Sequence, residues 1–122
     1  MLERAAENPI LKLRTDHPWE SEYVFNAAAL YLDGKVHLVY RAIGGSGLSV
    51  FGYASSKDGI HIDERLNDPI YMCAGPHVYP KACPAKQSSY SYASGGSWSG
   101  CEDPRLTRID DTIYIGSISK WI

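Results

Sequence analysis

Residues 24–41 read VFNAAALYLDGKVHLVYR, two apolar runs separated only by the Asp-Gly pair at 33–34. An Asp-Gly pair between apolar runs predicts a β-hairpin, because a type I′ turn needs a positive φ at both central residues. In the second run Val36, Leu38 and Tyr40 share one face, as expected for the two-residue period of a strand. This stretch therefore predicts two antiparallel strands joined by a tight turn.

Two further strands are predicted directly after this hairpin. Residues 48–56 follow a glycine-rich connection at 44–47, and a short run at 60–62 follows a Lys-Asp-Gly turn. Four short strands joined by tight turns form an antiparallel meander, the unit from which β-propeller blades are built. We therefore expect an all-β fold with a first blade at about residues 24–63.

The beginning of this pattern returns near the end of the chain. When Asn26 is placed over Asp103, the apolar positions and the turn of the first hairpin fall on similar residues at one constant offset. The next blade is therefore expected to start at 103–122, after a long loop at about 64–100. Repeat units bury their faces against neighbouring units, and at least three are usually needed for stability. About one and a half blades therefore predict the N-terminal part of a longer propeller.

The long loop is rich in Ser and Gly and carries Tyr90, Tyr92 and Trp98. Loops of this length inside a compact domain are usually functional or disordered. The aromatic residues favour a functional loop, because a pure linker rarely needs them. A mobile surface loop is the alternative.

Composition excludes several classes of protein. The chain has 122 residues with 12 Lys and Arg against 14 Asp and Glu, so it offers no basic surface for nucleic acid. It has neither the signal-peptide core nor the apolar run of about 20 residues that a membrane span requires. Cys73, Cys83 and Cys101 form no CxxC pair, and the four His have no metal-binding spacing. We expect free thiols, no metal site, no membrane partner and a cytoplasmic location.

The stretch GCEDPR at 100–105 holds the strongest candidate for acid–base chemistry. Pro104 lacks a backbone donor and biases Asp103 toward an extended conformation, which fixes the direction of the carboxylate, as a general acid requires. The alternative is an Asp-Pro turn in which Arg105 forms a surface ion pair.

Asn26 and Arg41 are expected near the same end of the sheet, because the first begins one strand of the hairpin and the second ends the other. Since the repeat makes Asp103 the equivalent of Asn26, all three residues could face one end of a central channel, where they would suit recognition of hydroxyl groups. The alternatives are that Asn26 is a capping residue at a strand end and that Arg41 is a solvated edge charge.

Six spaced stretches occur together in this chain: NPIL at 8–11, WE at 19–20, VFNAA at 24–28, VYRA at 39–42, SSKDGI at 55–60 and GCEDPRLT at 100–107. As a set they resemble the N-terminal portion of glycoside hydrolase family 130, the mannoside phosphorylases and related mannosidases. The family commonly has Pro where Ala27 stands, a departure that leaves the polar groups unchanged.

The resemblance implies a five-bladed β-propeller with the active site in its central pocket. Asp103 matches the general acid of the family, and Asn26, Arg41 and Arg105 match positions that hold the sugar or orient the acid. Inorganic phosphate would be the co-substrate, with no cofactor and no metal. The phosphate-binding residues are expected beyond Ile122, so we expect the fragment alone to be inactive.

The function expected from this resemblance is inverting phosphorolysis of β-1,4-mannosides, giving α-mannose 1-phosphate. The substrate would be a manno-oligosaccharide or a mannosyl-N-acetylglucosamine, and the full-length protein is expected to be a homo-oligomer. One alternative is a β-mannoside hydrolase, which needs a second carboxylate to activate water. The other is a non-catalytic sugar-binding propeller.

Overall fold

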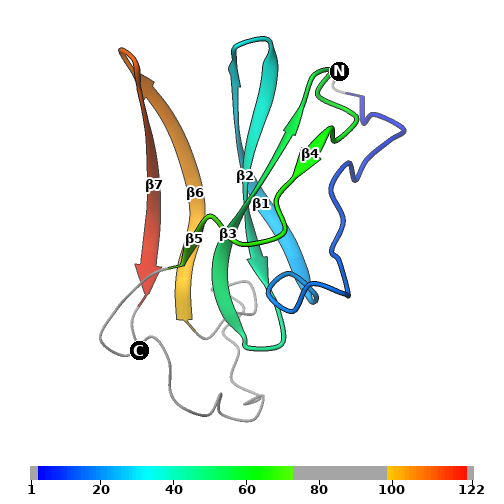
Figure 1. Cartoon of the computed structure of the whole chain (residues 1–122), viewed down its shortest axis with the longest axis vertical. Coiled ribbons are helices and arrows are strands. Elements are labelled where there is room, and N and C mark those ends of the chain that lie inside the picture. Colours follow the sequence, from blue (N-terminus) through cyan, green and yellow to red (C-terminus); the bar gives the residue numbers. More distant parts are fainter. Residues whose placement is uncertain (1–2, 73–98, 121–122) are drawn as a thin grey trace.

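The structure, a computed structural model, describes residues 3–72 and 99–120. All of its regular elements are strands: β1 (Tyr23–Leu32), β2 (Lys35–Ile43), β3 (Leu48–Ser56), β4 (Glu64–Arg65), β5 (Tyr71–Met72), β6 (Ser99–Ile109) and β7 (Thr112–Lys120). They form one sheet in the order β1-β2-β3-β6-β7, with β4 and β5 both paired to β3 (Figure 1). The expected all-β fold is confirmed. Within the described residues no helix is long and apolar enough to cross a membrane.

The first hairpin has the turn that its Asp-Gly pair predicts. Leu32 pairs with Lys35, and the two residues between them have positive φ, 50° at Asp33 and 79° at Gly34. Asp tolerates this left-handed region better than most residues, and Gly enters it without steric cost. The hairpin of β1 and β2 is therefore confirmed.

The β6–β7 hairpin repeats this design. Ile109 pairs with Thr112, and Asp110 in the turn has a φ of 53°. Each hairpin also has a β-bulge in its first strand, where the register shifts after Phe25 in β1 and after Glu102 in β6. The internal similarity seen in the sequence is therefore present in the structure.

The predicted strand at 60–62 is wrong. One carboxylate oxygen of Asp58, Oδ1, accepts hydrogen bonds from the backbone N–H groups of Ile60 at 2.8 Å and His61 at 2.7 Å. These bonds hold the segment in a turn, as an Asp side chain commonly does. The strand comes later, at β4, where Glu64 pairs with Ser55 of β3.

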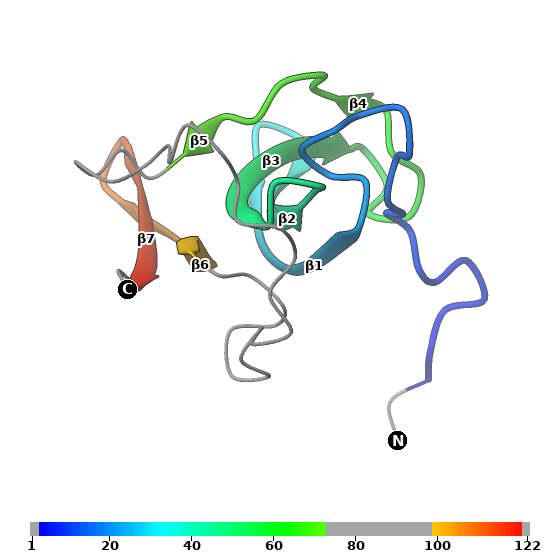
Figure 2. The ribbon, with the colours of Figure 1, turned by 90° about the horizontal axis from the view of Figure 1, so that it is seen from below.

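The core lies on both faces of β2 and β3, because successive residues of a strand point to opposite sides. One face buries Leu38, Tyr40, Ala42, Val50 and Ala54, and the N-terminal segment packs against it; the other buries Val39, Phe51 and Cys101. In Figure 2 the N-terminal segment and the β6–β7 hairpin lie on opposite sides of β1–β3. The β6–β7 hairpin therefore packs against the face of β2 and β3 that is opposite the N-terminal segment.

Part of the predicted loop at 64–100 lies outside the described residues, including Tyr90, Tyr92 and Trp98. Its first residues, up to position 72, contain the short strands β4 and β5 rather than irregular loop alone. Cys73 and Cys83 also lie outside the described residues, whereas Cys101 is fully buried.

Candidate active site

Asn26 and Asp103 occupy equivalent positions in the two β-bulges and face each other. Both have left-handed backbones, with φ values of 47° and 50°. Asn and Asp are among the few residues with a side chain that adopt this region readily, and a bulge redirects the side chain that it carries. The Nδ2 atom of Asn26 donates a hydrogen bond to Oδ1 of Asp103 at 2.7 Å. The repeated bulge thus joins the two hairpins through one amide–carboxylate contact.

The conformation of Asp103 corrects one expectation. The residue before a proline is normally pushed toward an extended backbone, and we expected this of Asp103 before Pro104. Its positive φ shows instead that the bulge between Glu102 and Arg105 sets the local geometry. The direction of the carboxylate is therefore determined by the bulge and by the groups that bind it.

Arg41 is the cation of this site. It pairs with Phe25 across the first hairpin, and its side chain is only 2% exposed, so the alternative of a solvated edge charge is wrong. Its Nη1 atom lies 3.3 Å from Oδ1 of Asp103, and its Nη2 atom lies 3.2 Å from Oε1 of Glu102. The guanidinium also lies over the Phe25 ring, 4.9 Å from its centroid, a favourable cation–π geometry. One buried guanidinium therefore binds two carboxylates from the neighbouring hairpin.

Glu102 is a site residue that the sequence analysis missed. In a regular strand, Glu102 and Asp103 would point to opposite faces. The bulge breaks this alternation and lets both carboxylates reach Arg41. Their exposure differs, because the Asp103 side chain is 35% exposed and that of Glu102 is 13% exposed. Asp103 is therefore the more accessible of the two to a ligand.

Arg105 lies beside Asp103, and its guanidinium binds the backbone there and not the carboxylate. Its Nη1 atom donates to the backbone carbonyl oxygens of Pro104 at 3.0 Å and Asp103 at 3.3 Å. The structure thus brings Asn26 and Arg41 to the carboxylate of Asp103 and leaves Arg105 exposed along the backbone next to it. The expected proximity of Asn26, Arg41 and Asp103 is confirmed.

Ser49 also binds Arg41. The Nε atom of Arg41 donates to Oγ of Ser49 at 2.6 Å, and that hydroxyl donates to the carbonyl oxygen of Cys101 at 2.6 Å. Ser49 belongs to β3 and pairs with Gly100 where β3 and β6 run parallel. The serine therefore lies where β3 meets the β6–β7 hairpin.

A second buried charge cluster anchors the N-terminal segment. Glu20 is fully buried and accepts hydrogen bonds from Tyr40 and Arg65, and Arg65 also donates to the Tyr40 hydroxyl at 3.0 Å. Burial raises the pKa of Tyr40 to about 12. This cluster lies on the opposite face of β2 from Arg41, so its role is to hold the residues before β1 in place.

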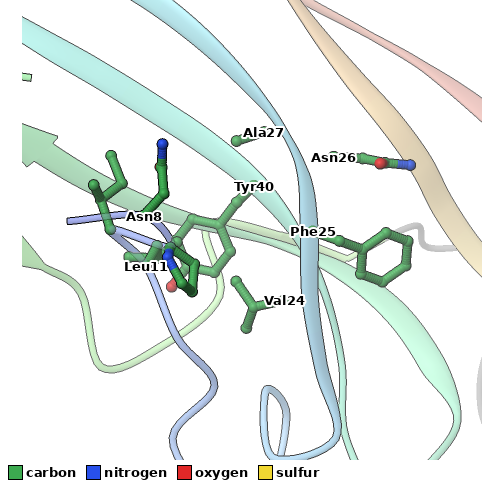
Figure 3. Close-up of a pocket in the computed structure, with 9 residues that line it drawn as sticks. Asn8, Leu11, Val24, Phe25, Asn26, Ala27 and Tyr40 are labelled. Atoms are coloured by element: carbon green, nitrogen blue, oxygen red, sulfur yellow. The ribbon is translucent and has the colours of Figure 1, made fainter. Parts of the chain in front are cut away.

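The pocket in Figure 3, about 190 Å³ in volume, lies where the N-terminal segment crosses β1. Asn8, Leu11, Val24 and Tyr40 gather on one side of β1, whereas Phe25 and Asn26 point to the other side, toward β6. The pocket is mainly apolar, and the side chain of Asn26, which binds Asp103, points away from it. In residues 3–72 and 99–120, no cluster of three or more His, Cys, Asp or Glu side chains could hold a metal ion.

Two curated proteins are similar to the chain in sequence, although no family model matches it. The chain is 34% identical over 127 residues to a β-1,2-mannobiose phosphorylase of Thermoanaerobacter sp. (strain X514). This match covers 93% of the chain and 35% of the phosphorylase. The chain is also 35% identical to a 1,2-β-oligomannan phosphorylase of the same organism, over 93% of this chain and 34% of that protein.

Solved structures show the same relationship in three dimensions. One is a structure from family GH130. This family of mannoside phosphorylases contains glycoside hydrolases that target β-1,2-mannosidic linkages in Candida mannan. The structure matches with a TM-score of 0.59 and 31% identity, over 84% of this chain and 29% of that one. A glycosyl hydrolase from Bacteroides ovatus matches with a TM-score of 0.62 and 28% identity, over 88% of this chain and 31% of that one.

The chain spans about a third of the length of the curated relatives that it matches. The sequence likeness to these relatives extends over 93% of this chain, and the fold likeness to the GH130 structure extends over 84% of it. The chain is therefore similar in sequence to two phosphorylases of β-linked mannosides and in fold to a structure from glycoside hydrolase family 130.

Proposed function

We propose that the complete polypeptide carrying this sequence is a β-mannoside phosphorylase in which Asp103 is the general acid. Both curated relatives are phosphorylases of β-linked mannosides. The observation that carries the proposal is the Asp103 carboxyl group, partly exposed and held on one oxygen by Asn26 and by the buried Arg41. An accessible carboxyl group in a fixed position suits proton transfer to a bound substrate.

The chemistry follows from this arrangement. Both donors reach Oδ1 of Asp103, so the proton given to the glycosidic oxygen would leave from Oδ2. The bond from the anomeric carbon to that oxygen breaks as an oxygen of inorganic phosphate forms a bond to the same carbon from the opposite face. The products are α-mannose 1-phosphate and the released sugar with its new hydroxyl proton, and Asp103 is left as a carboxylate.

A phosphorylase needs no second carboxylate, because phosphate is already an anionic nucleophile. An inverting hydrolase needs a base about 6.5 to 9.5 Å from the acid to activate water. Glu102 is unsuited to that role, because it binds the same guanidinium as Asp103 and so lies on the acid's side of the substrate. This favours phosphorolysis within the described part of the site.

The proposal extends to linkage and architecture. The two phosphorylase relatives act on β-1,2-linked mannosides, which supports a β-1,2 linkage here in place of the β-1,4 linkage expected from the sequence. We further propose that Arg105 contributes to sugar binding and that the strands described here belong to a five-bladed propeller. The phosphate site would be supplied by residues outside this sequence.

Hydrolysis is the second candidate function, because the GH130 family of mannoside phosphorylases also contains glycoside hydrolases. The test is to incubate the purified complete polypeptide with β-1,2-mannobiose, β-1,4-mannobiose and mannosyl-N-acetylglucosamine, with and without phosphate. The proposal predicts phosphate-dependent release of mannose 1-phosphate from the β-1,2-linked substrate. Free mannose at a rate independent of phosphate would identify a hydrolase, and binding without cleavage would identify a sugar-binding protein.

A further inference from the structure

The guanidinium of Arg41 lies between two hairpins, and its position depends on more than its two carboxylate partners. Charge attraction alone would allow the planar group to rotate or slide along the acids. The bond from Nε to Ser49, at 2.6 Å, constrains the third edge of the plane. Because guanidinium donors point in fixed directions, this contact helps to set the orientation of both Nη atoms.

Ser49 is itself held in place. Its side chain is buried, with 1% of the residue exposed, and its backbone pairs with Gly100. A Cβ atom on Gly100 would lie 2.2 Å from the carbonyl oxygen of Ser49, so only glycine permits this close approach. The serine hydroxyl therefore projects from a backbone that is fixed against β6.

The hydroxyl also has a defined orientation. Its single proton is donated to the carbonyl oxygen of Cys101, which leaves its oxygen to accept from Arg41. Cys101 directly precedes the two acids that Arg41 binds. One hydroxyl thus connects the cation from β2 to the backbone of β6 that carries its carboxylate partners.

We infer that Ser49 is a positioning residue for the reaction of Asp103, acting through Arg41 without touching the substrate. This inference rests on the proposed function, since it assigns the serine a role in the same site. If it is correct, removal of the hydroxyl changes the orientation of the guanidinium and hence of the acid. Misplacement of a catalytic group by about 1 Å can lower a rate by roughly a hundredfold.

The test is a double-mutant cycle with Ser49→Ala and Arg41→Lys in the complete polypeptide, measured on the substrate that it turns over. We expect Ser49→Ala to lower kcat by roughly ten- to a hundredfold with KM little changed. In the Arg41→Lys background the same change should have little further effect, because lysine has no Nε–H group to donate. Ser49→Cys, which accepts hydrogen bonds only weakly, is the second variant if the alanine variant does not fold.

Ser55→Ala is the matched control. Ser55 lies on the same strand and is 2% exposed, but its hydroxyl binds Glu64, away from the site. Its effect on kcat should be small and independent of Arg41. Equal effects of Ser49→Ala and Ser55→Ala, or effects of Ser49→Ala and Arg41→Lys that simply multiply, would overturn the inference.

A measurement without turnover separates this inference from the proposed function. In the folded wild-type protein, the Arg41 Nε–H signal in an NMR spectrum should exchange slowly with water. Ser49→Ala should shift that signal and speed its exchange, whereas Ser55→Ala should not. If no β-mannoside is cleaved, the proposed function fails. The spectrum alone then decides whether Ser49 orients Arg41, and an unchanged signal in Ser49→Ala rejects that orienting contact.

Discussion

Replacing Gly100 with alanine should be among the most disruptive small changes in this chain. Gly100 has a φ of 116°, and a Cβ there would lie 2.2 Å from the Ser49 carbonyl oxygen and 2.8 Å from its nitrogen. Both contacts are to backbone atoms, which cannot rotate away as a side chain could. The β6–β7 hairpin would have to move away from β3 where β3 and β6 run parallel.

The magnitude can be built from two contributions. A side chain forced into a positive φ costs about 1–2 kcal/mol, and overpacking of a close contact costs about 1–3 kcal/mol more. Gly100→Ala should therefore lower the free energy of unfolding by about 2–5 kcal/mol. Activity should fall as well, because Ser49 would move relative to Cys101.

Two other glycines separate these contributions. Gly34 has a φ of 79° but open space around a Cβ, so Gly34→Ala should cost only the conformational part, about 1–2 kcal/mol. Gly45 has open space and no positive φ, so Gly45→Ala should be close to neutral. The assay is urea unfolding of the complete polypeptide, followed by fluorescence. If Gly100→Ala were no more destabilising than Gly34→Ala, the close approach of β3 and β6 would be refuted.

Three further predictions concern other contacts. Glu20→Gln should destabilise the protein by about 3–5 kcal/mol in urea unfolding, because it leaves the buried charge of Arg65 uncompensated; a change below about 1 kcal/mol would contradict this. The hydrogen bond between His61 and Asp58 raises the pKa of His61 above its ordinary value and lowers the pKa of Asp58. An NMR titration should therefore show His61 losing its proton at a higher pH than an unperturbed histidine. The Asp58 contribution to stability is complete above a pH of about 3.9 and is lost on acidification, whereas that of His61 is complete below about 6.5 and is lost as the pH rises through its raised pKa. Asp58→Asn should return the His61 pKa toward its ordinary value, and an unmoved titration would reject the pairing. Asn26→Gly keeps the left-handed backbone but removes the amide bound to the acid, so kcat should fall roughly tenfold with little loss of stability; an unchanged kcat would exclude a role for the amide.

Local signals predicted the hairpins well because the physics that forms them is local. The Asp-Gly pair at 33–34 needs only its own φ values to make a tight turn, and the two-residue period of β2 needs only burial of one face. The same locality explains the failure at 60–62. There the apolar pattern favoured a strand, but the backbone N–H groups of Ile60 and His61 donate to the Asp58 carboxylate and so are not available to pair with a neighbouring strand.

The part of the candidate site that the internal repeat covers could be predicted from the sequence. The equivalence of Asn26 and Asp103, with hairpin pairing for Arg41, placed three of its residues together. Glu102 could not be found in this way, because a bulge cancels the alternation on which the reasoning depends. Ser49 gave no signal either, since its role arises from the contact of two hairpins that are distant in the sequence.

The assignment of Asp103 as a general acid makes a claim that one comparison can decide. Asp103→Asn and wild type would be assayed on a natural β-mannoside and on an aryl β-mannoside whose leaving group needs no proton. Asp110→Asn is the matched control, because Asp110 also has a positive φ but lies exposed in the β6–β7 turn.

We predict that Asp103→Asn lowers kcat on the natural substrate by roughly 10²- to 10⁴-fold while turnover of the aryl mannoside is largely retained. The Asp110→Asn variant should match wild type on both substrates. Equal losses on the two substrates, or undiminished cleavage of the natural one by Asp103→Asn, would contradict the assignment.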